Sequence, residues 1–124
     1  MSTPSDILLV EDEDALAELL RRVLVRAGYT VRIAADGHQA LAALDVARPA
    51  VLILDLVLPV INGFAVLEQI HQRQIIVPIV VITANPLNDE ALPHTDIRRV
   101  LVKPFPIGEL VAAIHAIRAG QRYA

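Results

Sequence analysis

Short aliphatic runs alternate with segments of helical periodicity along almost the whole chain, and this alternation restricts the possible folds most. The runs cover residues 7–10, 30–34, 51–54, 79–82 and 100–102. Several are apolar throughout and rich in β-branched residues, which is typical of strands buried on both faces of a sheet. Strands that alternate with helices are joined by right-handed crossovers. The pattern therefore predicts a doubly wound α/β domain with a five-stranded parallel sheet.

Five helical segments are expected, one after each strand. The first begins near Asp14, which we predict to be a helix cap, and ends at Gly28, which is suited to a left-handed C-terminal position. The fourth segment, residues 85–99, is expected to be irregular because Pro86 and Pro93 interrupt it. Arg32 is expected to point outward from the second strand. Turns are predicted at Asp36-Gly37, where Asp36 can also cap a helix, and at Asn62-Gly63.

The composition favours one aliphatic-core domain. The 124 residues are 55% hydrophobic but only 3% aromatic, and cysteine is absent, which excludes a disulfide framework and a thiol nucleophile. No apolar run approaches the length of a membrane span, and no signal peptide is recognisable, so we expect a cytoplasmic protein without a membrane segment. The net charge of -3 and the lack of a basic face argue against nucleic-acid binding by this chain.

Reactive side chains follow four of the five predicted strands. Glu11 and Asp12 follow the first strand, Asp55 the third, Thr83 the fourth and Lys103 the fifth. The carboxyl ends of parallel strands lie at one edge of the sheet, where ligands bind near the topological switch point. We therefore expect these five residues to form one site.

The chemistry of this set can be inferred from its donor atoms. Carboxylates that lie close together repel one another and require a cation. Oxygen ligands without histidine or cysteine suit Mg²⁺, with Mn²⁺ as an alternative. Lys103 and Thr83 are suited to contact phosphoryl oxygens, and Asp55 can act as a nucleophile that forms an aspartyl phosphate.

From Ile7 to about Arg118 the sequence resembles the receiver domain of two-component response regulators, the family of the chemotaxis regulator. The resemblance rests on four motifs in order, each weak alone and specific together. They are Glu11-Asp12 after Leu-Leu-Val, Asp55-Leu-x-Leu-Pro59 followed by Asn62-Gly63, Thr83-Ala84, and Lys103-Pro104-Phe105.

The resemblance implies a flavodoxin-like strand order 2-1-3-4-5 and one receiver domain over residues 1–124, with its core at 7–118. It implies that Asp55 accepts a phosphoryl group from a sensor histidine kinase or phosphotransfer protein. Mg²⁺ would be held by Asp12, Asp55 and the backbone carbonyl of Val57, with Glu11 acting mainly through water. Such a domain catalyses its own aspartyl phosphorylation and dephosphorylation. The Lys103-Pro104 peptide bond would be cis.

Two departures from the family pattern are visible. The aromatic residue that usually lies three positions before the lysine is Val100 here, so the usual aromatic readout of phosphorylation is absent. The irregular segment at 85–99 also puts the family's common dimer face in doubt. These departures leave a pseudo-receiver, which signals without phosphorylation, as an alternative. An aspartate-nucleophile phosphatase is disfavoured because Val57 stands where such enzymes carry a general acid.

Because the chain ends at Ala124, soon after the last predicted helix, we expect either a single-domain regulator or a part of a larger one.

Overall fold

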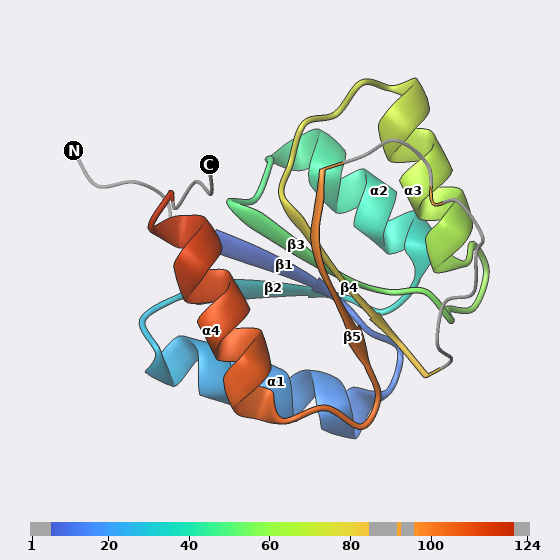
Figure 1. The fold of residues 1–124 in the computed structure, drawn as a ribbon. Coiled ribbons are helices and arrows are strands. Elements are labelled where there is room, and N and C mark those ends of the chain that lie inside the picture. Colours follow the sequence, from blue (N-terminus) through green and yellow to red (C-terminus); the bar gives the residue numbers. More distant parts are fainter. Residues whose placement is uncertain (1–5, 85–91, 93–95, 121–124) are drawn as a thin grey trace.

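The computed structural model describes residues 6–84, 92 and 96–120, and within them it forms a single sheet flanked by helices (Figure 1). The elements in chain order are β1 (Asp6–Val10), α1 (Asp14–Arg26), β2 (Thr30–Ala34), α2 (Gly37–Val46), β3 (Val51–Asp55), α3 (Gly63–Gln72), β4 (Ile79–Thr83), β5 (Ile97–Val102) and α4 (Ile107–Arg118). No helix among these is long and apolar enough to cross a membrane.

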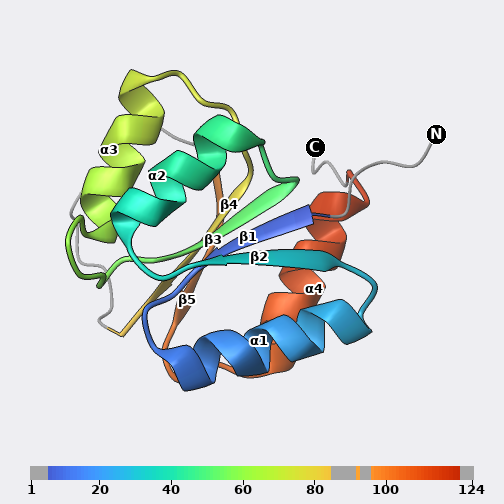
Figure 2. The same cartoon turned by 180° about the vertical axis from the view of Figure 1, so that it is seen from behind.

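All strand pairs are parallel, and the order in the sheet is β2-β1-β3-β4-β5. This confirms the fold class and the strand order expected from the sequence. Helices α2 and α3 cover one face of the sheet, and α1 and α4 cover the other (Figures 1 and 2). Each face has its own buried cluster of aliphatic residues, one centred on Leu52 and Leu54 and the other on Val51 and Ile53. The alternation along β3 therefore supplies both cores.

The number of helices and the start of β5 differ from the expectation. Four helices are present in the described residues, whereas five were predicted. Most of the predicted fourth segment, residues 85–91 and 93–95, lies outside the described part of the chain. Its last residues, 97–99, belong to β5, which begins at Ile97 and not at Val100. A register shift between Ile79 and Val80 accompanies the pairing of β4 with β5. The first part of β5 was not predicted because Arg98 and Arg99 interrupt the aliphatic pattern, which a strand at the edge of the sheet allows.

The helix ends follow local sequence signals, with one correction. Gly28 has a φ of 105°, and the N–H groups of Gly28 and Tyr29 donate to the carbonyls of Val25 and Leu24 at 3.0 and 3.1 Å. This double hydrogen bond is the predicted C-terminal glycine motif. The prediction that Asp14 caps α1 is wrong: Glu13 is the N-cap residue, and no side chain caps it.

Arg32 is not directed into solvent as expected. Its guanidinium is half-buried and lies 2.7 Å from Asp6 Oδ2 on the neighbouring strand. It also donates to the carbonyls of Ala43 and Ala47, at 3.3 and 2.9 Å, near the C-terminus of α2. A cation at this end of a helix satisfies carbonyls that lack partners within the helix. Arg32 therefore joins β1, β2 and α2.

Replacing Arg32 with alanine is expected to lower the free energy of unfolding by roughly 1 to 2 kcal/mol, because charge-assisted hydrogen bonds are lost. Urea unfolding measures this change. Arg22→Ala is the matched control, because the Arg22 side chain is 72% exposed and, among the residues the structure describes, its ion pair is with Glu18 of its own helix. Its effect should stay within about 0.5 kcal/mol. Equal losses for both variants would contradict the role of Arg32 as a link between elements.

Candidate functional site

The acidic residues predicted from the sequence meet at the carboxyl edge of the sheet. Glu11 and Asp12 follow β1, and Asp55 is the last residue of β3, which pairs with β1. One carboxylate oxygen from each residue lies within 4.8 Å of the other two. The parallel register of β1 and β3 explains why the three carboxylates lie close together, because it pairs Val10 with Leu54 and so brings the residues that follow to the same edge of the sheet.

Two of these carboxylates are buried and share one cation. Glu11 is 1% and Asp55 is 2% exposed, whereas Asp12 is exposed. Lys103 Nζ lies 2.8 Å from Asp55 Oδ2 and 3.1 Å from Glu11 Oε1. Lys103 follows β5, which is separated from β3 by β4, so its long side chain reaches across a strand. An ion pair of this kind offsets the free-energy cost of burying the carboxylates.

The pKa values of Glu11 and Lys103 reflect this burial. Burial raises the pKa of Glu11 to about 7, although hydrogen bonds from the Glu13 backbone N–H and from Lys103 act in the opposite direction. Burial of Lys103 disfavours its charged form, but the hydrogen bonds to Asp55 and Glu11 outweigh this and raise its pKa above the usual value. The lysine is therefore positively charged at neutral pH.

Hydrogen bonds of the Thr83 and Val57 backbone connect these two residues to the acidic site. Thr83 is the last residue of β4 and is 2% exposed, and its carbonyl accepts from the Lys103 N–H at 2.7 Å. The Val57 N–H donates to Asp55 Oδ1 at 2.9 Å, which fixes the carboxylate against the loop that follows it. The Lys103–Pro104 bond is cis, as the resemblance implies. The structure thus brings all the residues predicted from the sequence to one edge.

The loop between β3 and α3 is held tightly but contains a strained residue. Leu56 and Leu58 are buried in the core, and the Gly63 N–H donates to the Leu56 carbonyl at 3.0 Å. Val60, between Leu58 and Gly63, has a φ of 66° although the residue is 80% exposed. A β-branched residue rarely adopts this left-handed conformation, which costs about 1 to 3 kcal/mol. No burial of the Val60 side chain offsets that cost.

Gly37 and Gly63 begin helices, which differs from the turn positions predicted from the sequence. A Cβ on Gly63 would lie 2.4 Å from Leu56 Cα and 2.6 Å from the Asp55 carbonyl oxygen. Glycine is needed there because other backbone approaches closely. The preceding Asp36 and Asn62 cap the helices, each accepting a backbone N–H, from Gln39 at 2.8 Å and Ala65 at 2.9 Å respectively.

The donor set fits a hard divalent cation. The three clustered residues offer only carboxylate oxygens, the ligand type preferred by Mg²⁺. Exposed Asp12 leaves one side of the cluster open, while the buried carboxylates of Glu11 and Asp55 are fixed by the hydrogen bonds described above. The fold and site thus define a doubly wound α/β protein with an acidic, lysine-bearing edge.

Comparison with known proteins assigns the chain to a family. Residues 7–115 match the response regulator receiver domain family. The chain is 38% identical over 113 residues to response regulator MprA of Mycobacterium ulcerans, which covers 90% of this chain and 49% of MprA. It is 35% identical over 113 residues to transcriptional regulatory protein TcrA of Mycobacterium tuberculosis, covering 90% and 45%. The chain spans about half the length of the curated relatives it matches.

A solved structure supports the same assignment. The response regulator TrrA of Thermotoga maritima, in complex with Mg²⁺ and BeF, superposes with a TM-score of 0.80 at 28% identity. The superposition covers 90% of this chain and 97% of TrrA. The chain belongs to the response regulator receiver domains of two-component systems. Phosphorylation and Mg²⁺ binding at an acidic pocket are typical of this family.

Val60→Asn is expected to raise the free energy of unfolding by about 1 kcal/mol, because asparagine tolerates the left-handed conformation better than valine. Chemical denaturation measures the change. Val46→Asn is the control, since Val46 is 83% exposed in α2 and has no positive φ. That variant should change stability by no more than about 0.5 kcal/mol. No gain for Val60→Asn over Val46→Asn would mean that the loop conformation stores no such strain.

Proposed function

We propose that the protein is a phosphorylation-dependent signalling switch in which Asp55 accepts a phosphoryl group. The observation that carries the proposal is the arrangement of the Asp55 carboxylate. It is buried, bound by Lys103 at 2.8 Å, and lies within 4.8 Å of carboxylate oxygens of Glu11 and Asp12. An aspartate that only caps a helix or forms a turn would not require a lysine from another strand and two further carboxylates beside it.

In the proposed reaction, an Asp55 oxygen attacks the phosphorus of a phosphohistidine on a sensor histidine kinase or a phosphotransfer protein. The phosphorus–nitrogen bond breaks, the histidine leaves with its electron pair, and an acyl phosphate forms on Asp55. Hydrolysis later transfers the phosphoryl group to water and restores the carboxylate. Phosphorylation then changes the binding of a downstream protein.

The other residues of the site would hold and neutralise charge. Mg²⁺, with Mn²⁺ as an alternative, would be bound by Asp12, Asp55 and the Val57 carbonyl, with Glu11 in its outer shell. When bound, the ion supplies positive charge that reduces repulsion between the carboxylates and the incoming phosphoryl oxygens.

Lys103 would exchange part of its contact with Asp55 for a phosphoryl oxygen, and the Thr83 hydroxyl would donate to another.

We further propose that the receiver unit is a single domain over residues 1–124, with its core at 7–118. The proposed partners are proteins: a kinase or phosphotransfer protein upstream and a target downstream. Because the net charge is -3 and no basic face is recognisable in the sequence, direct binding of nucleic acid by this chain is not expected. A cytoplasmic location fits a partner that carries a phosphohistidine.

The proposal predicts one added phosphate per chain after incubation with acetyl phosphate and Mg²⁺, measured by intact-mass spectrometry. EDTA should prevent the addition, because the carboxylates would then repel the donor. Asp55→Asn should abolish it, because an amide is a poor nucleophile. Asp45→Asn is the matched control, since Asp45 is an exposed residue of α2, and it should be phosphorylated like the wild type.

An Asp55→Asn protein that still gains the phosphate would overturn the assignment of Asp55. Absence of any adduct, with acetyl phosphate or a phosphorylated histidine donor, would favour the pseudo-receiver alternative, in which the same fold binds its partner constitutively.

The phosphoryl group is expected to hydrolyse slowly, with a half-life of minutes or longer. Val57 is 58% exposed beside Asp55 and cannot form a side-chain hydrogen bond to an attacking water. Val57→Asn supplies a polar side chain at this position and should shorten the half-life, followed as loss of the added mass after removal of the donor. Val60→Asn, in the same loop, is the control and should leave it unchanged. A wild-type half-life of seconds would contradict this prediction.

A further inference from the structure

We propose that Gly37, at the start of α2, is a positioning residue for the acidic site, although it lies on a different element. Its absent side chain would allow the loop between β3 and α3 to rest against α2 and would thereby fix Val57 and Asp55. This inference rests on the proposed function, because Mg²⁺ binding and phosphoryl uptake are two of its readouts.

The contact between Gly37 and the loop is a backbone contact. Gly37 is buried, and a Cβ on it would lie 2.1 Å from the Ile61 carbonyl oxygen. The same Cβ would lie 2.9 Å from Ile61 C and Cβ. These separations are far below van der Waals contact, so alanine at position 37 requires a shift of α2 or of the loop. No positive φ is found at Gly37, so the close approach alone requires glycine.

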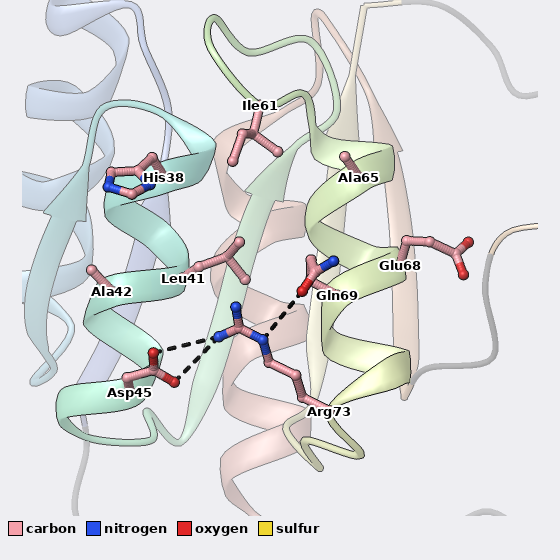
Figure 3. A pocket seen from close by; sticks show the side chains of 9 residues that line it. All are labelled: His38, Leu41, Ala42, Asp45, Ile61, Ala65, Glu68, Gln69 and Arg73. Carbon is pink, nitrogen blue, oxygen red and sulfur yellow. Dashed lines mark hydrogen bonds and ion pairs between the residues drawn. The ribbon is translucent and has the colours of Figure 1, made fainter.

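The exposed residues of the loop are the part that would move, because Leu56 and Leu58 are buried in the core. Helix α2 is anchored by buried Ala40, Leu41 and Leu44 in the core beneath it. Figure 3 shows α2 and α3 flanking a groove, with Ile61 at one end and an ion pair between Arg73 and Asp45 toward the other. The ion pair therefore joins α2 to the residue that follows α3.

In the loop, by contrast, Val57 and Val60 are exposed and Val60 is already strained. Fewer contacts resist a displacement of these residues.

A displacement of Ile61 has a short path to the acidic site. Ile61 precedes Asn62 and Gly63, and the Gly63 N–H donates to the Leu56 carbonyl at 3.0 Å. The next residue, Val57, donates its N–H to Asp55 Oδ1 at 2.9 Å and supplies the carbonyl proposed as a metal ligand. Residues that orient metal ligands from outside the coordination shell commonly affect metal affinity strongly.

The test compares Gly37→Ala with Gly108→Ala. Gly108 also lies in the first turn of a helix, α4, but a Cβ there meets nothing within 4 Å. Calorimetric titration with Mg²⁺ should show roughly 10-fold weaker binding for Gly37→Ala and no change for Gly108→Ala. In metal-free protein, the Val57 amide resonance should shift in Gly37→Ala only. Phosphoryl uptake by Gly37→Ala should be slow at limiting Mg²⁺ and recover at saturating Mg²⁺.

Two further variants separate positioning from a general loss of stability. Leu24→Ala creates a cavity in the opposite core cluster and should lower stability without changing Mg²⁺ affinity or the Val57 resonance. Ile61→Gly loosens the loop where it meets Gly37 and should also weaken Mg²⁺ binding, so the inference stays testable if Gly37→Ala does not fold.

Wild-type Mg²⁺ affinity and an unshifted Val57 resonance in Gly37→Ala, or in Ile61→Gly if the former does not fold, would overturn the positioning role. A wild-type protein that binds no Mg²⁺ would instead overturn the proposed function. In that case the Val57 resonance of the metal-free variants would still decide the positioning role.

Discussion

The ion pairs of Lys103 are the interaction on which the rest of the site depends. Glu11 and Asp55 are nearly inaccessible to solvent, and two buried carboxylates so close together are stable only with a nearby positive charge. Lys103 supplies that charge from the end of β5. The contact therefore requires β1, β3 and β5 to end at the same edge, with β4 correctly placed between β3 and β5. The geometry of the site and the topology of the sheet depend on each other.

Much of the fold and of the candidate site could be predicted from the sequence, because its signals are local. Uninterrupted aliphatic runs specify buried parallel strands, and Gly28 ends α1 as its type requires. Once the strands are parallel, the residues that follow them must meet at one edge. The alternation of strands and helices therefore predicts Glu11, Asp55 and Lys103 at one edge, and the strand order implied by the resemblance to receiver domains predicts how close they lie.

The features that the sequence did not reveal depend on contacts between distant elements. Arg32 has the alternation of an outward-facing residue, and its contacts with Asp6 and with the carbonyls of α2 make it a link. The beginning of β5 was hidden because an edge strand tolerates polar residues such as Arg98 and Arg99. Likewise, no property of the acidic run indicates that Glu11 is buried and only 1% exposed.

Gly37 of α2 and Val60 of the loop between β3 and α3 show how local signals and contacts between distant elements act together. A glycine after aspartate has the sequence signature of a turn, yet Gly37 is required because the Ile61 carbonyl occupies the space of its side chain. Buried Leu56 and Leu58 anchor the loop on the side of Asp55, and Val60 beyond them has an unfavourable backbone conformation. A relaxed Val60 would require a different path between Asp55 and α3. The strain at Val60 is therefore maintained by the same contacts that hold the loop beside the Asp55 carboxylate.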